Sequence, residues 1–192
     1  MHMSDDRPLI TIDVDGVLCR PPFGLNPGRG QNKKRDKPGT WNVLWPLERL
    51  RYVGRKPMPG ARDGLEGLLR EYRCEVLSAR GAAAGGYTSG WIRSKLGVDI
   101  HLNLRPHWRE TSARFKARMA SELGASVHIE DDPHTARWLA ELIPHVLLVD
   151  WPRNEWLDGT NIHRITSIDE APGLIRRLLG IAPTDVVDGQ PR

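Results

Sequence analysis

The amino-acid sequence predicts an α/β fold: a Rossmann-like, doubly wound parallel sheet with a small basic cap insertion after its first strand. Short apolar runs alternate along the chain with segments in which apolar residues recur at helical spacing. At 192 residues the chain suits one domain with an insertion of about forty residues. We expect a flexible N-terminus at residues 1–7, the domain at 8–182 with its insertion at about 20–58, and a flexible tail at 183–192.

The first predicted strand, residues 9–13, is an apolar run that ends in an acid. Similar runs predict strands at residues 74–77, 100–104, 126–130 and 146–149. Apolar residues at helical spacing predict helices around residues 65–72, 91–96, 115–123, 138–142 and 174–179. The expected helix ends are Thr88 or Ser89 as the cap of the second helix, Thr111 or Ser112 as the cap of the third, Asp132-Pro133 at the start of the fourth, and Gly180 after the last.

A parallel sheet with helices on both faces gathers the carboxyl ends of its strands at one edge. This follows because parallel strands run in the same direction, and right-handed crossovers return the chain to the opposite edge before each new strand. Ligands of such sheets bind at this edge, near the point where the strand order reverses. Residues that directly follow the strands are therefore the first candidates for a functional site.

The composition excludes several classes of protein. A content of 39% hydrophobic and 27% charged residues excludes a collagen-like or wholly disordered chain. No apolar run approaches the ~20 residues of a membrane span, and the first residues lack the basic and apolar regions of a secretory signal. Cys19 and Cys74 are too few for a disulfide framework or a zinc module, so we expect a cytoplasmic protein with no membrane partner.

The predicted insertion is strongly basic. Residues 20–56 contain ten Lys and Arg against Asp36 and Glu48, a net charge of +8 in a chain whose total is +4. A basic segment on a mildly acidic body indicates an anionic partner, which is a nucleic acid, a nucleotide or another phosphorylated molecule. Trp41 and Trp45 lie in this segment, and they either stack on a base or hold the insertion together.

The most informative motif, Asp13-Val14-Asp15-Gly16, directly follows the first predicted strand. Two carboxylates spaced by two residues point the same way from extended backbone, and Gly16 permits a sharp turn after them. A solvated turn has a similar composition, so the motif alone leaves both interpretations open.

Further polar residues follow other strands and are expected at the same edge. Ser78 ends the second predicted strand, Asp131 and Asp132 end the fourth, and Lys116 lies early on the helix before that strand. Ser78 could instead only end its strand, and Asp132 could only cap the helix that Pro133 begins. Together, however, several carboxylates, a hydroxyl and an ammonium group favour phosphoryl transfer with Mg²⁺ as the cofactor.

In such a site each of four residues has an expected role. Asp13 attacks phosphorus and forms an aspartyl-phosphate, and Asp15 protonates the leaving oxygen and then activates water. Ser78 hydrogen-bonds a phosphoryl oxygen, while Lys116 neutralises charge and holds Asp13 in place.

These motifs, in this order, resemble those of the haloacid dehalogenase (HAD) superfamily of phosphohydrolases over residues 8–180. The resemblance implies that Asp13, the backbone carbonyl of Asp15 and Asp131 bind the metal, with Asp132 nearby or acting through water. It also favours Lys116 over Lys95, because the lysine of this family lies between the third and fourth strands.

Residues 129–133 and 148–154 look like the 5′(3′)-deoxyribonucleotidase branch of this superfamily, although the basic insertion stands where that branch has an aromatic-rich cap. The resemblance implies a Mg²⁺-dependent phosphatase of a small phosphomonoester, with nucleotides among the candidates. The expected substrate-binding residues are Ser78, Arg80, Lys116, Trp41 and Trp45.

Two other functions stay open. One is a polynucleotide end-processing phosphatase, whose basic insertion follows a nucleic-acid backbone. Another is a HAD-like binding module without turnover. A metal-dependent glycosyltransferase also uses an Asp-x-Asp motif, but there the motif usually follows a nucleotide-binding half, which we do not expect before residue 8 here.

Overall fold

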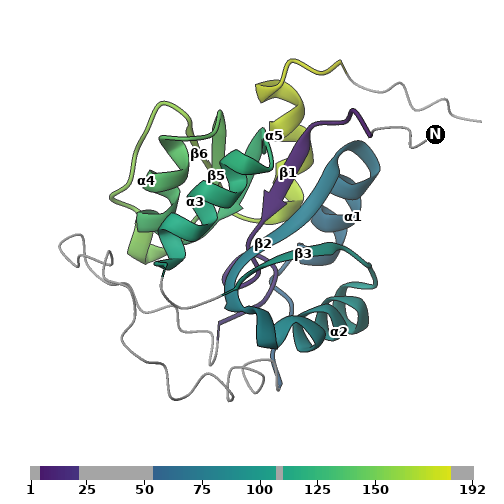
Figure 1. Cartoon of the computed structure of the whole chain (residues 1–192). Helices are drawn as coiled ribbons and strands as arrows, with labels where there is room; N and C mark the ends of the chain where they lie inside the picture. The colour runs from purple at the N-terminus through teal and green to yellow at the C-terminus, as the bar shows by residue number, and fades with distance from the viewer. Residues whose placement is uncertain (1–4, 22–53, 107–109, 183–192) are drawn as a thin grey trace, which may run out of the picture.

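A computed structural model describes residues 5–21, 54–106 and 110–182. In these residues the chain forms a parallel sheet in the strand order β3-β2-β1-β4-β5-β6 (Figure 1). The strands are β1 Leu9–Ile12, β2 Arg73–Gly81, β3 His101–Arg105, β4 Val127–Glu130, β5 His145–Val149 and β6 Ile162–Ile165. The predicted α/β, Rossmann-like fold is therefore confirmed.

The α-helices are α1 Ala61–Glu71, α2 Gly85–Leu96, α3 Ser112–Glu122, α4 Pro133–Ala140 and α5 Ala171–Leu178. Short 3₁₀ turns occupy Ala82–Ala84, Pro152–Asn154 and Ile168–Glu170. Helices α1, α2 and α5 pack on one face of the sheet, where Leu65, Ile92 and Ile175 join its core. Helices α3 and α4 cover the other face through side chains such as Phe115 and Leu139. Both faces are thus buried, as the apolar strands require.

Several element boundaries differ from the prediction. Helix α2 begins at Gly85, so Thr88 and Ser89 lie inside it and neither is its cap. The Thr88 hydroxyl instead donates to the carbonyl of Ala84 at 2.8 Å. Strand β2 continues past Ser78 to Gly81, with a shift of register against β3 between these two residues.

Two predicted caps are confirmed, and one strand was missed. The Thr111 hydroxyl accepts a hydrogen bond from the backbone N–H of Arg114 at the start of α3, and Asp132 caps α4. Strand β6 was not predicted, because His163 and Arg164 interrupt its short apolar run. Helix α5 ends at Leu178, close to the expected end at Gly180.

The two ends of the basic insertion meet beside β1. Cys19 forms an antiparallel bridge with Pro57, and the backbone N–H of Arg20 donates to the carbonyl of Lys56 at 2.9 Å. The rest of the insertion, including Trp41 and Trp45, lies outside the described residues, as do residues 1–4 and 183–192. The expected domain limits therefore stay a prediction.

In the described part of the chain, none of the helices combines the length and the apolar character that crossing a bilayer demands.

Candidate active site

The loop after β1 starts at the point where the strand order reverses. Strand β1 lies between β2 and β4, and the backbone N–H of Asp13 donates to the carbonyl of Ile129 in β4 at 3.0 Å. The loop then turns sharply at Gly16, whose φ of 86° lies in the left-handed region that glycine tolerates. Asp13 is thereby placed where ligands of open α/β sheets bind.

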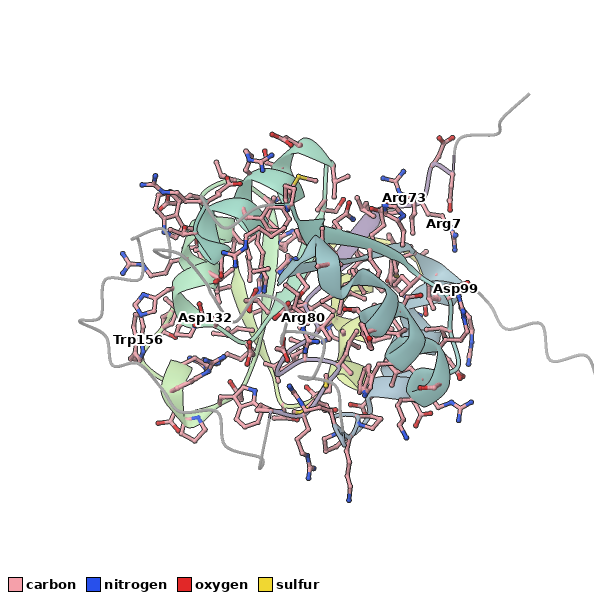
Figure 2. All side chains as sticks on the ribbon, turned by 60° about the horizontal axis from the view of Figure 1, so that its bottom comes forward. Arg7, Arg73, Arg80, Asp99, Asp132 and Trp156 are labelled. Atoms are coloured by element: carbon pink, nitrogen blue, oxygen red, sulfur yellow. The ribbon has the colours of Figure 1, made fainter. Side chains whose placement is uncertain are left out.

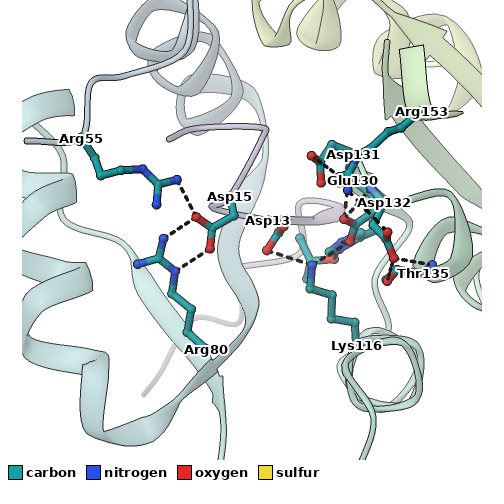
Figure 3. A network of polar contacts seen from close by, with 12 residues as sticks. Asp13, Asp15, Arg55, Arg80, Lys116, Glu130, Asp131, Asp132, Thr135 and Arg153 are labelled. Carbon is teal, nitrogen blue, oxygen red and sulfur yellow. Dashed lines mark hydrogen bonds and ion pairs between the residues drawn. The ribbon is translucent and has the colours of Figure 1, made fainter. Parts of the chain in front are cut away.

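Four side chains from three elements meet at this point, and we call them the buried cluster: Asp13, Lys116, Glu130 and Asp131 (Figure 3). The ammonium nitrogen of Lys116 lies 2.9 Å from a carboxylate oxygen of Asp13 and 2.8 Å from one of Glu130. One oxygen from each of the three carboxylates lies within 4.8 Å of the others. All four residues are buried.

Glu130 is the member of this cluster that the sequence analysis missed. Its Oε1 accepts the backbone N–H groups of Asp131 at 3.1 Å and Asp132 at 3.0 Å, while its Oε2 accepts from Lys116. Its sequence signal is a carboxylate at the end of an otherwise apolar strand, which must find a cation or several donors inside the protein.

A chain of buried polar side chains extends from the cluster along strands β4 and β1. His128 Nε2 lies 3.3 Å from the Glu130 carboxylate, and His128 Nδ1 lies 2.8 Å from the Thr11 hydroxyl. Burial lowers the pKa of His128, so its ring is neutral. The arrangement is satisfied when Nε2–H donates to Glu130 and Nδ1 accepts from Thr11, which assigns the tautomer.

The charges of the buried cluster are strongly interdependent. Burial raises the pKa of Asp13, and Lys116 offsets only part of that effect. Burial would also raise the pKa of Glu130, but Lys116 and His128 outweigh it and hold the pKa below its usual range. For Lys116, the two carboxylates outweigh burial and raise its pKa. The ammonium is therefore charged, and Glu130 is its permanent counter-ion.

Arg153 adds a second cation at the edge of the cluster. Its Nη2 donates to Asp131 Oδ2 at 2.5 Å, and its Nη1 lies 3.8 Å from Asp132. Asn154 donates to the backbone carbonyl of Asp131 at 3.0 Å. With Arg153 and Asp132 counted, four carboxylates face two cations, so the group carries excess negative charge when it is fully ionised. An oxygen-rich site with excess negative charge suits a hard divalent cation.

Asp15 points away from this group, towards two arginines (Figure 3). Arg80 Nε donates to Asp15 Oδ2 at 2.7 Å, and Arg55 Nη2 donates to Oδ1 at 2.8 Å. Arg80 was expected to bind substrate, and here it holds Asp15. Arg55 was not singled out in the sequence, since nothing local marks it among the other basic residues near the end of the insertion.

The remaining predicted residues are placed as follows. Asp132 Oδ2 accepts from the N–H of Thr135 at 3.2 Å and from its hydroxyl at 2.8 Å, so its side chain caps α4. Ser78 is buried in β2, two residues beyond Val76, which pairs with Ile12. Lys116 is buried beside Asp13, whereas Lys95 is exposed on α2. The predicted metal ligands Asp13, Asp15, Asp131 and Asp132 stay a prediction, and the described carboxylates that converge are Asp13, Glu130 and Asp131.

Comparison with known proteins identifies the fold. No protein-family model matches the sequence, and no curated protein gives a significant match. Among solved structures, the D,D-heptose 1.7-bisphosphate phosphatase from B. bronchiseptica, complexed with magnesium and phosphate, has a TM-score of 0.54 at 12% identity, over 88% of this chain and 98% of that one.

Two further solved structures give the same result. A haloacid dehalogenase-like family hydrolase from Xanthomonas campestris has a TM-score of 0.60 at 10% identity, over 90% of this chain and 96% of its own. CbbY from Rhodobacter sphaeroides, in complex with phosphate, has a TM-score of 0.55 at 14% identity, over 85% of this chain and 96% of its own. The chain therefore has the HAD-like fold that the sequence motifs imply.

Proposed function

We propose that this chain is a Mg²⁺-dependent phosphatase that hydrolyses a small phosphomonoester through an aspartyl-phosphate on Asp13. The observation that carries the proposal is the contact of Asp13, Lys116, Glu130 and Asp131 at the strand-order reversal. Their elements are far apart in the sequence, and the cost of burying such charges together is hard to explain by stability alone. The HAD-like fold, which known phosphatases share, supports the same function.

The buried cluster fits Mg²⁺ because it offers converging carboxylate oxygens with excess negative charge. Asp13 and Asp131 would hold the ion, as the resemblance implies, and Asp131 would exchange its contact with Arg153 for the metal. Both oxygens of Glu130 accept hydrogen bonds, from Lys116 and from two backbone N–H groups. When bound, the ion would neutralise the carboxylates and the phosphate oxygens and so allow an anion to approach an anion.

The residues of the chain then have the following roles. An Asp13 oxygen attacks phosphorus, the ester P–O bond breaks, and Asp15 gives its proton to the leaving oxygen. Water then attacks phosphorus, its proton passes to Asp15, and the bond between Asp13 and phosphorus breaks to release phosphate. Lys116 keeps Asp13 oriented throughout. Arg55 and Arg80 donate to the two carboxylate oxygens of Asp15 here, so Asp15 must turn from at least one of them and carry a proton to act as the acid.

The test is hydrolysis of a panel of phosphomonoesters by the full chain, with Mg²⁺ and with a chelator. We expect turnover that needs Mg²⁺ and that falls at least ~10³-fold in Asp13→Asn. We also expect a phosphoenzyme that hydroxylamine cleaves, as it does an acyl phosphate. Activity in Asp13→Asn above a few percent would contradict the role of Asp13. Failure on every substrate in excess Mg²⁺ would favour the binding module without turnover.

A polynucleotide substrate is the second candidate, because both ends of the basic insertion meet beside the Asp13 loop. That function predicts oligonucleotide binding that weakens steeply with salt and is lost when Lys33, Lys34 and Arg35 are neutralised. A mononucleotide preference that does not depend on salt would count against it. A cytoplasmic location stays part of the main proposal, and the free thiols of Cys19 and Cys74 support it.

A further inference from the structure

A pocket of about 370 Å³ opens where strands β5 and β6 lead into the following loop. It is lined by Asp150, Trp151, Pro152, Glu155 and Arg164. Its volume is in the range of small-molecule sites. None of the roles assigned to the buried cluster uses these residues.

The pocket and the buried cluster share a wall. The indole N–H of Trp151 donates to the backbone carbonyl of Gly16 at 3.2 Å. On its other side, Gly16 lies directly against Asp131, because a Cβ added to this glycine would be 1.8 Å from Asp131 Oδ2. Gly16 therefore contacts Trp151 through its carbonyl and Asp131 through its Cα, so one residue links the wall of the pocket to the buried cluster.

Trp151 forms a fixed platform in this wall. Its side chain is half-buried against the apolar core. Its indole N–H is held by Gly16, and its backbone N–H donates to Asn154 Oδ1 at 3.2 Å. An aromatic side chain held at several points offers its free surface for stacking at little entropic cost. This geometry favours a planar ligand.

The polar groups of the pocket select the charge of that ligand. Arg164 is already occupied, because it donates to Asp150 at 2.6 Å and to the backbone carbonyls of Asn154 at 2.8 Å and Leu157 at 2.9 Å. Glu155 is exposed, and no hydrogen bond or ion pair ties up its carboxylate within the described residues. The pocket thus presents acceptors and an excess negative charge, which suits N–H donors and disfavours a second phosphate.

We infer that this pocket receives the leaving group of the substrate, and that this group is a planar, nitrogen-bearing ring with N–H donors. Such a ring would stack on Trp151 and donate hydrogen bonds to Glu155, while the phosphate lies at the buried cluster. The inference rests on the proposed function for its catalytic meaning, but the binding of the ring alone does not depend on it.

The first experiment compares kcat/KM for adenosine 5′-monophosphate, glycerol 3-phosphate and fructose 1,6-bisphosphate. We expect the nucleotide to be preferred and the bisphosphate to be the poorest substrate. In Trp151→Leu the preference for the nucleotide over glycerol 3-phosphate should fall about tenfold or more, since one stacked ring is lost. Trp151→Phe should retain part of it, and Glu155→Gln should narrow the gap to the bisphosphate. Trp138→Leu, a tryptophan change on α4 away from the pocket, should leave the ratios unchanged.

The second experiment measures the binding of adenosine, which has no phosphate, to the full chain by calorimetry. Binding that Trp151→Leu weakens and Trp138→Leu does not would support the pocket even if no phosphomonoester is hydrolysed, in which case only the proposed function fails. Hydrolysis with unchanged substrate ratios in Trp151→Leu and Glu155→Gln would overturn the pocket and leave the phosphatase intact. A preference for the bisphosphate would also overturn it.

Discussion

The two carboxylates of the Asp13–Asp15 loop have different surroundings, although they are only two residues apart. Asp13 is buried beside Lys116, and both side chains are at most 6% exposed. The side chain of Asp15 is 38% exposed, while the arginines that hold it, Arg55 and Arg80, are buried. Figure 3 shows these two groups on opposite sides of the loop. One acid is therefore fixed when the protein folds, and the other keeps access to solvent and to a change of partner.

This difference matches the division of work in the proposed reaction. A nucleophile benefits from a fixed position, because its attack needs a narrow range of geometries. An acid and base must exchange protons with the leaving group and water, so it benefits from exposure. Four substitutions test this comparison, ordered here by their expected effect on the free energy of unfolding.

Lys116→Met should have the largest effect. It leaves Asp13 and Glu130 buried without their shared cation, which destabilises the fold by about 3–5 kcal/mol. Urea unfolding of the variant measures this loss. The double variant Lys116→Met/Glu130→Gln should regain part of it, because one of the uncompensated charges is gone. Stability within about 1 kcal/mol of the parent chain would contradict the cluster as described.

Gly16→Ala should come next. Its Cβ would overlap the Asp131 carboxylate, 1.8 Å away, and its φ of 86° is unfavourable for alanine. We expect a loss of about 1–3 kcal/mol together with a marked fall in activity, because Asp131 must move. The matched control is Gly54→Ala, which has a φ of 70° but nothing within 4 Å of its Cβ. Equal losses in the two variants would show that the contact with Asp131 is unimportant.

Asp15→Asn should separate stability from activity. The free energy of unfolding should fall by about 1–2 kcal/mol, because the amide oxygen can still accept from one arginine but the buried guanidinium groups lose their carboxylate. Turnover should fall by about 10²–10⁴-fold, since an amide can neither give nor take the proton. Circular dichroism with steady-state kinetics checks both. Rapid turnover in this variant would remove Asp15 from the mechanism.

Arg118→Ala should have the smallest effect and serves as the control for Lys116. Arg118 lies on the same helix, α3, and pairs with Glu110 and Glu122, but its side chain is 43% exposed. Pairs of this kind contribute about 0–1 kcal/mol, because water screens them. A loss as large as that of Lys116→Met would mean that burial is not what distinguishes the two ion pairs.

The fold and the centre of the site could be predicted because they follow from patterns along the chain. Apolar runs and helical spacing give the order of strands and helices, and this order brings Asp13, Lys116 and Asp131 to one edge. The contacts of Arg55 and Arg153 could not be predicted, since they depend on which side chains face each other after folding. Glu130 was missed because Asp131 and Asp132, which directly follow it, already match the acidic pair of the family. Only the folded structure shows that the carboxylate of Glu130 contacts Lys116.

The contacts of Thr88 and Arg80 show where prediction from neighbouring residues in the sequence fails. The hydroxyl of Thr88 has the chemistry of a helix cap, but it lies inside α2 and donates to the carbonyl of Ala84, four residues earlier and just before the helix. Composition alone does not single out Arg80 from other arginines such as Arg7 and Arg73, which Figure 2 shows away from it. Its contact with Asp15 becomes visible only in three dimensions.

The two ends of the basic insertion are paired with each other, so the sheet does not depend on the sequence between them. Backbone hydrogen bonds of 2.9 Å join Arg20 to Lys56 and Met58 to Leu18, so the two described ends of the insertion lie side by side. Because the segment between these residues begins and ends at the same place, its replacement by another sequence would leave the strands of the sheet unchanged. An exchange that spares Gly54 and Arg55 would also keep the contact of Arg55 with Asp15, and with it the surroundings of the proposed acid.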